Sequence, residues 1–174
     1  LMIDEPVIDV IDNFLPQSQF LELKEKIFDE YFPWQYNKEK TDGEDHLWNF
    51  QFYHMFADAR SDYRSEYFPI LQPVLEELGA IFSVRIKANI TGVSNKIRLY
   101  NMHTDTEYRC KTAVYYLNTN NGKTVFEGDV EVESVENRIA IFDSNLKHTA
   151  TTHTDEKVRS VINFNYVTDE MAKW

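Results

Sequence analysis

The stretch Tyr100-Asn101-Met102-His103-Thr104-Asp105 decides how the rest of the chain is interpreted. In an extended strand, residues two positions apart point to the same face, so His103 and Asp105 would present an imidazole and a carboxylate side by side. A second imidazole, from His148, would complete a set of two histidines and one carboxylate. Such a set leaves coordination positions open on a metal and suits the non-haem Fe(II) that is used for O₂ chemistry.

Arg159 follows His148 and lies within 157–167, a run with the composition of a strand. A buried arginine in a strand needs an anion, and the far carboxylate of a dicarboxylic acid such as 2-oxoglutarate would supply one through a bidentate pair. The alternative is an ordinary surface arginine at a strand end. The apolar neighbours Val158 and Ile162 argue against that alternative, because they place Arg159 inside the strand.

The ordered set His-x-Asp, His and Arg resembles the Fe(II)/2-oxoglutarate-dependent oxygenases. Residues 109–118, with the sequence RCKTAVYYLN, are similar to the strand that follows the metal motif in the prolyl hydroxylase-like branch. Residues 137–144 are similar to the segment that precedes the second histidine of those enzymes. The likeness covers roughly residues 85–167. It implies a mainly β fold, a double-stranded β-helix (a jelly roll, cupin-like) with N-terminal helices packed on one sheet.

The resemblance also implies an activity and a set of cofactors. The chain would be a dioxygenase that uses Fe(II), takes 2-oxoglutarate as co-substrate, hydroxylates a carbon centre and releases succinate and CO₂, with ascorbate as reductant. His103, Asp105 and His148 would be the catalytic metal ligands, and Arg159 would bind 2-oxoglutarate. Without that context, His103 and Asp105 read equally well as strand residues near a surface turn.

Further residues are candidates for the co-substrate pocket. Tyr116 matches the second tyrosine of the family's Tyr-Tyr-Leu-Asn run, which donates a hydrogen bond to the co-substrate; its alternative is a core aromatic residue. Asn89 would contribute an amide to the same pocket. The tyrosine that the family carries around this strand is not evident here, and Tyr100 would replace it. The second His-x-Asp, at 153–155, lies in a polar stretch that predicts a hairpin turn rather than a rigid ligand pair.

The amino-acid sequence leaves two classes of prime substrate as alternatives. The prolyl hydroxylase-like strand favours a peptidyl side chain such as proline, whereas the short chain without an obvious peptide-binding segment favours a free amino acid or small metabolite. Nucleic acid is disfavoured as a partner by the net charge of −11. Two other classes are a non-oxidative cupin-type protein that binds a metal and a ligand, and a binding protein that retains the motif by descent. The oligomeric state is left open.

Length and composition predict one domain over residues 1–174. The resemblance implies that it is an oxygenase domain, with 1–80 as an N-terminal strand and helical support and 81–168 as the β-helix core. The chain has 174 residues, of which 43% are hydrophobic, which is enough for one core. A single cysteine, Cys110, cannot form an internal disulfide. Because neither a signal peptide nor a membrane span is visible, we expect a cytoplasmic protein.

Hydrophobic periodicity predicts helices at 17–31 and 65–79, with Pro69 and Pro73 either delaying or kinking the second. The polar segment 37–46 is a candidate mobile loop that could close over the site. Strands are expected at 7–12, 47–56, 82–90, 96–102, 111–118, 124–126, 129–134, 137–142 and 157–167.

Overall fold

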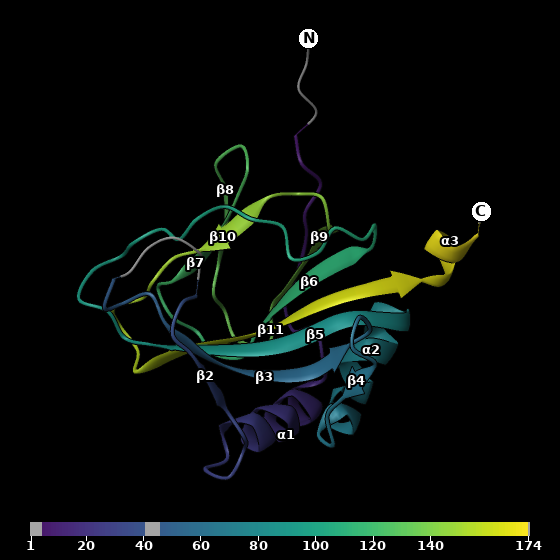
Figure 1. Ribbon diagram of the computed structural model, residues 1–174, viewed down its shortest axis with the longest axis horizontal. Helices are drawn as coiled ribbons and strands as arrows, with labels where there is room; N and C mark the ends of the chain where they lie inside the picture. The colour runs from purple at the N-terminus through teal and green to yellow at the C-terminus, as the bar shows by residue number, and fades with distance from the viewer. Residues whose placement is uncertain (1–4, 41–45, 174) are drawn as a thin grey trace.

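Two antiparallel sheets face each other in the computed structural model, which describes residues 5–40 and 46–173. The larger sheet has the strand order β1-β9-β6-β11-β5-β3-β2, with β4 paired to β3, and the smaller sheet has the order β10-β7-β8. Figure 1 shows the smaller sheet above the larger one, with the helices α1 and α2 beneath the larger sheet. The predicted double-stranded β-helix with helices on one sheet is therefore confirmed.

The strands of the larger sheet are β1 (Asp9–Ile11), β2 (Gln35–Asn37), β3 (Gln51–Asp58), β4 (Tyr63–Arg64), β5 (Ala80–Gly92), β6 (Lys111–Tyr116), β9 (Ile139–Asp143) and β11 (Val158–Thr168). Those of the smaller sheet are β7 (Lys123–Phe126), β8 (Val130–Glu133) and β10 (His148–Ala150). The helices are α1 (Gln17–Phe28), the 3-10 helix η1 (Phe68–Leu71), α2 (Gln72–Leu78) and α3 (Asp169–Ala172). No helix in the described ranges is both long and apolar enough to pass through a membrane.

The helix α1 packs on the outer face of the larger sheet through Phe20, Leu23 and Ile27, all of them buried. This spacing places the three side chains on one stripe of the helix. The helix ends at Phe28, earlier than periodicity predicted. It ends there because Asp29 takes an extended backbone conformation, and its carboxylate accepts a hydrogen bond from the backbone N–H of Tyr31 at 2.9 Å.

The two prolines of the second predicted helix divide it rather than kink it. Pro69 lies at the start of η1 and Pro73 at the start of α2, where the missing N–H of a proline is tolerated. Gly79 ends α2 with a left-handed backbone, φ 65°, which a residue without a Cβ adopts without strain. The predicted span of 65–79 is therefore two short helices.

Alternation along β6 separates two apolar layers. Tyr115 points toward the helices and packs edge-on against Phe14 and Phe20 between the larger sheet and α1. Val114 and Tyr116 point the other way, into the space between the two sheets. Since successive side chains of a strand face opposite sides, this single strand supports both the helical layer and the wall of the interior.

The strand predicted at 96–102 is wrong. Only isolated bridges, Leu99 with Thr151 and His103 with His148, occur near this part of the described chain. The physical reason is a side chain: the Thr152 hydroxyl accepts from the backbone N–H of Arg98 at 2.7 Å and donates to the carbonyl of Lys96 at 2.8 Å. A side chain thus occupies the N–H of Arg98 and the carbonyl of Lys96, and the backbone bonds that remain, such as Tyr100 N–H to the Ala150 carbonyl, do not extend into a ladder.

The polar segment predicted as a loop is only partly described. Asn37 ends β2, and residues 41–45 of the predicted mobile loop lie outside the described residues. Sequence reasoning missed the short strands β2, β4 and β10. Strands of two or three residues carry too little periodicity to be recognised.

Candidate metal centre

His103 and Asp105 reach the interior from an irregular segment that lies against β10. The backbone N–H of His103 donates to the carbonyl of His148, and the N–H of His148 donates back to the carbonyl of His103, both at 3.0 Å. Two residues on opposed backbones in such a pair carry their side chains on the same face. The two imidazole rings accordingly lie with their centroids 5.0 Å apart.

The ligand atoms of three side chains converge beside this pair. Nε2 of His103 lies 3.4 Å from Oδ1 of Asp105, and Nε2 of His148 lies 3.6 Å from the same oxygen. The group His103, Asp105 and His148 offers one ligand atom from each residue, with all of these atoms within 4.8 Å of one another. The structure therefore brings together the three residues that the sequence singled out.

Backbone carbonyls orient both imidazoles. Nδ1 of His103 lies 3.1 Å from the carbonyl of Asn101, and Nδ1 of His148 lies 3.2 Å from that of Leu146. With Nδ1–H donating to a carbonyl, Nε2 is the atom that faces Asp105: the neutral ring offers its lone pair to a metal, and the protonated ring donates Nε2–H to the carboxylate. Histidines that bind metals are commonly held in this tautomer by such a second contact.

Asp105 is the anionic member of the cluster. Burial alone would raise its pKa, but hydrogen bonds and positive charge from the two imidazoles outweigh burial, so the pKa lies well below the usual carboxyl range. Its second oxygen, Oδ2, is buried without a hydrogen-bond partner among the described residues. Two nitrogen lone pairs and one carboxylate, of which one oxygen is unsatisfied, form a donor set that fits a divalent transition metal.

The cluster lies between an apolar wall and an opening. His148 is buried against Phe142 and Phe126, at ring centroid distances of 4.9 and 6.1 Å. The His103 side chain is 46% exposed, in contrast to 6% for that of His148. One side of the candidate centre is therefore dry and rigid, while the His103 side faces a cavity that a ligand can enter.

Arg159 lines the same cavity from β11 and is buried, with 4% of its surface exposed. Its Nε donates to Oγ of Ser134 at 3.2 Å, and its guanidinium lies 5.9 Å from the centre of the Tyr116 ring. Burial lowers its pKa, and no carboxylate of the described residues forms an ion pair with it. A buried guanidinium without a counter-ion is a binding site for an anion.

Gly122 makes the position of Arg159 possible. A Cβ on Gly122 would meet Cδ of Arg159 at 2.8 Å and the side-chain oxygen of Asn120 at 2.8 Å, closer than real contacts allow. The Ser134 hydroxyl donates to the Gly122 carbonyl at 2.7 Å and so fixes the partner of Arg159. The sequence analysis assigned no role to Gly122. The contact with Arg159 joins residues far apart in the chain, so the residues around the turn do not indicate it.

The other predicted pocket residues occupy different places. Asn89 lines the cavity, and its side-chain oxygen is buried without a partner among the described residues. Tyr100 also lines it, and burial raises the pKa of its hydroxyl to about 12. Tyr116 lies beside Arg159, but its hydroxyl is hydrogen-bonded to Oγ1 of Thr124 at 2.6 Å. Its position therefore fits the core alternative as well as the co-substrate role.

The cavity also contains cations that sequence reasoning passed over, namely Lys40, Arg85 and Lys87. A usable signal was present in the sequence, because a period of two along β5 puts Arg85, Lys87 and Asn89 on one face. That periodicity is enough to group Arg85 and Lys87 with Asn89 from the amino-acid sequence alone.

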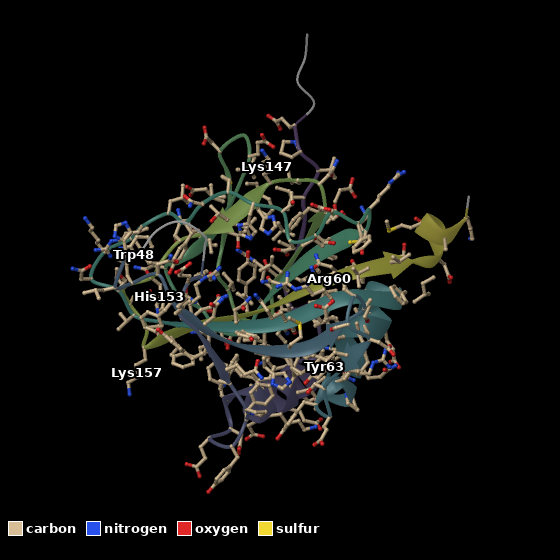
Figure 2. The ribbon with its side chains drawn as sticks, in the orientation of Figure 1. Trp48, Arg60, Tyr63, Lys147, His153 and Lys157 are labelled. Carbon is tan, nitrogen blue, oxygen red and sulfur yellow. The ribbon has the colours of Figure 1, made fainter. Side chains whose placement is uncertain are left out.

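The rival motif at 153–155 is not a ligand pair. His153 is fully buried, and its Nε2 donates to the carbonyl of Glu156 at 2.9 Å. Asp155 instead accepts from the backbone N–H of Asn121 at 3.0 Å. Figure 2 shows His153 and Trp48 at the same end of the molecule, where the chain turns between β10 and β11. Residues 153–155 connect β10 to β11, but these strands belong to different sheets, so the predicted hairpin turn is not formed.

Comparison with solved structures places this fold among known ones. A prolyl hydroxylase from Trichoplax adhaerens, in complex with a hypoxia inducible factor oxygen degradation domain peptide fragment, has a TM-score of 0.62 at 16% identity, over 95% of this chain and 86% of that one. An oxidoreductase of the 2OG-Fe(II) oxygenase family from Burkholderia pseudomallei has a TM-score of 0.64 at 11% identity, over 92% and 84%. The epimerase SnoN from nogalamycin biosynthesis, in complex with Fe³⁺, alpha ketoglutarate and nogalamycin RO, has a TM-score of 0.64 at 12% identity, over 94% and 79%.

In comparisons of sequence, neither a protein-family model nor a curated protein matches the chain. The structural likeness extends over more than nine-tenths of the chain in each case. At these identities it is the backbone arrangement that is shared. This chain has the fold of the Fe(II)- and 2-oxoglutarate-dependent oxygenases, including their prolyl hydroxylases.

Proposed function

We propose that this chain is an Fe(II)- and 2-oxoglutarate-dependent oxygenase. The observation that carries the proposal is that a candidate metal site and a candidate anion site line one cavity. Two imidazoles and a carboxylate converge at one place, and the buried guanidinium of Arg159, without a carboxylate partner among the described residues, lines the same cavity. A metal ligand set and an anion site of this kind suit a co-substrate that chelates the metal at one end and carries a carboxylate at the other.

In this proposal His103, Asp105 and His148 hold the iron, and Arg159 binds the far carboxylate of 2-oxoglutarate. With iron and 2-oxoglutarate bound, O₂ would be the oxidant: one oxygen atom would enter succinate as CO₂ is lost, and the other would enter the substrate, with ascorbate as reductant. The protein orients the iron and 2-oxoglutarate: carbonyls of residues 101 and 146 hold the imidazoles, Ser134 holds the guanidinium, and Phe142 excludes water behind His148.

The reaction is proposed to be hydroxylation of a carbon centre. A peptidyl side chain such as proline is one candidate substrate, in keeping with the peptide-bound prolyl hydroxylase of the same fold. A free amino acid or small metabolite is the other. We further propose that residues 1–174 act as one domain in a reducing compartment such as the cytoplasm, since Cys110 is buried and free.

Succinate release tests the proposal. The protein is incubated with Fe(II), ascorbate and 2-oxoglutarate, and succinate is measured together with the affinity for 2-oxoglutarate. We expect slow succinate formation that depends on Fe(II). If the protein binds a metal and has no affinity for 2-oxoglutarate, the oxygenase proposal is wrong and a non-oxidative cupin-type function replaces it.

Arg159→Ala separates the anion site from the metal site. Loss of one partner from a buried charge pair costs on the order of 2–5 kcal/mol, so 2-oxoglutarate affinity should fall by that amount while metal affinity is unchanged. Arg60→Ala is the matched control, because Arg60 is a surface arginine paired with Asp58. Metal affinity that fell without a change in 2-oxoglutarate affinity would show that Arg159 has been given the wrong role.

A further inference from the structure

The cavity beside the candidate metal centre carries more positive charge than the proposed co-substrate requires. Lys40, Arg85, Lys87 and Arg159 line it, and Asp105 is the one carboxylate among its described lining residues. The whole chain has a net charge of −11, so this concentration of cations is not a consequence of a basic composition. Such a local field attracts anions into the cavity.

The cations are spread along the inner face of the larger sheet. In the pairing of β11 with β5, Arg159 is opposite Thr91, whereas Asn163 is opposite Lys87. Asn163 is four residues after Arg159 in β11, which corresponds to about 13 Å between their backbone positions at the rise of a strand. The backbone of Lys87 is therefore about that far along the sheet from the backbone of Arg159. Arg159 and Lys87 thus extend into the cavity from different levels of its wall.

The co-substrate cannot neutralise both cations. In the proposed function one carboxylate of 2-oxoglutarate is engaged by Arg159 and the other by the metal. Neither carboxylate is then left for Lys87. An additional anion is required if the charge of Lys87 is to be compensated.

The part of the chain that the structure describes gives Lys87 no anionic partner. Among residues 5–40 and 46–173 no carboxylate forms an ion pair with it, and its Nζ lies 5.5 Å from the centre of the Tyr53 ring. Burial, followed by the charge of Arg85, lowers the pKa of Lys87 to about 8, although Asp105 opposes the shift. A desolvated ammonium without a counter-ion is costly, and an anionic ligand would offset that cost.

Lys40 and Arg85 flank this site. The Lys40 Nζ lies 4.0 Å over the ring of Tyr100, and burial, together with the charges of Arg159 and Lys87, holds its pKa well below the ordinary lysine range. Arg85 donates from Nη1 to the backbone carbonyl of Asp105 at 3.3 Å, while its Nε is buried without a partner among the described residues. Arg85 therefore retains capacity to bind an anion, and a bound anion would favour the charged form of Lys40.

Resting on the proposed oxygenase function, we propose that Lys87, flanked by Lys40 and Arg85, binds an oxyanion of the prime substrate. The substrate is then an acid with a carboxylate or phosphate group, and a free acid is favoured over an internal residue of a neutral peptide. Binding of the oxyanion at Lys87 would place the adjoining carbon skeleton next to the His103 side of the candidate metal centre, which opens to the same cavity.

Inorganic phosphate is the probe, because it tests the oxyanion site without knowledge of the substrate. Protein loaded with Mn(II) and excess 2-oxoglutarate is titrated with phosphate, and the phosphorus relaxation rate is measured. The paramagnetic ion accelerates relaxation only of phosphate held near it. We expect a saturable effect in the wild type that weakens by about tenfold or more in Lys87→Met, the size expected for loss of one charged hydrogen bond.

Two further variants make the measurement specific. Lys87→Arg keeps the charge and should keep the phosphate effect, which shows that loss in Lys87→Met is not a failure of folding. Lys123→Met removes an exposed lysine that pairs with Glu131 and should leave phosphate binding unchanged. Equal phosphate binding by wild type and Lys87→Met would overturn the inference. It would also be overturned if Lys87→Met lost as much affinity for 2-oxoglutarate as for phosphate.

Failure of the proposed function gives a different result. If the oxygenase proposal is wrong, the wild type lacks affinity for Mn(II) or for 2-oxoglutarate. If only the present inference is wrong, the wild type binds both, and Mn(II) has no saturable effect on phosphate relaxation. Competition then identifies the oxyanion. If acetate displaces phosphate at a lower concentration than methyl phosphate does, the site prefers a carboxylate; the reverse order indicates a phosphate group. Displacement by neutral acetamide or methanol at a similar concentration would argue against an anion site.

Discussion

His103 and His148 are joined through their backbones, with each N–H donating to the other's carbonyl at 3.0 Å. This reciprocal pair brings an irregular segment and the short strand β10 into register at the one place where two imidazoles must meet. The bridge belongs to the backbone, so the geometry of the cluster does not depend on the imidazoles themselves. The side chains are therefore open to substitution without loss of the fold.

His103→Ala should abolish high-affinity metal binding and leave the fold intact. The side chain is 46% exposed, and its backbone bridge to His148 survives the change. Metal titration and thermal unfolding without metal measure the two effects separately. Thr104→Ala, an exposed change between the proposed ligands, is the control. A large loss of thermal stability in metal-free His103→Ala would mean that the residue is structural.

Gly122→Ala should weaken 2-oxoglutarate binding while leaving metal binding unchanged. Its new methyl group would displace Arg159, whose Cδ lies 2.8 Å from the place of that Cβ. Misplacement of one buried charged partner predicts a loss of about 2 kcal/mol in a 2-oxoglutarate titration. Gly92→Ala is the matched control, because nothing lies within 4 Å of its added Cβ. The account fails if the two variants bind 2-oxoglutarate equally well.

Asn137→Ala should destabilise the protein by about 3 kcal/mol, because it leaves several buried polar groups unpaired. The Asn137 amide accepts from the backbone N–H of Leu15 at 3.0 Å, donates to the Leu15 carbonyl at 2.8 Å and accepts from the Tyr115 hydroxyl at 2.5 Å. It also has φ 61°, which asparagine tolerates better than alanine. Urea unfolding measures the loss.

Tyr115→Phe provides the graded comparison for Asn137→Ala. It removes only one of these hydrogen bonds and should cost about 1 kcal/mol. Similar losses for the two variants would mean that the contacts with Leu15 contribute little.

Stability should fall as pH decreases below about 6.5, in part because of His54. Its Nδ1 donates to the carbonyl of Pro33 at 2.8 Å, and Nε2 faces the Ser65 hydroxyl at 2.7 Å. Burial lowers its pKa in the folded state, despite the opposing contact with Pro33. The unfolded chain therefore binds a proton first, so the stabilisation is complete above the unfolded pKa and is lost as pH falls toward the folded pKa.

His54→Asn isolates this contribution. The difference in unfolding free energy between wild type and variant, measured by urea titration, should shrink between about pH 8 and pH 5.5. A difference that stays constant over that range would exclude His54 as the titrating group. His153, whose pKa burial also lowers, is present in both proteins and cancels in the comparison.

Several features of the fold were predictable because they depend on local chemistry. The end of the second predicted helix at residue 79 is confirmed, because Gly79 ends α2 with a left-handed backbone. The long strand β11 was predicted nearly to its bounds, since eleven residues carry enough periodicity. The helix at 17–31 was predicted too long because the turn at Asp29 depends on one side-chain contact.

The sequence by itself determined the order of the candidate ligands, the strand that carries Arg159 and the likeness to an oxygenase fold, since these are matters of residue type and spacing. Only the tertiary structure decided that 96–102 is not a strand, that Gly122 makes room for Arg159, and that Lys40 lines the same cavity. These features depend on contacts between residues far apart in the chain. Periodicity describes one segment at a time and does not contain such contacts.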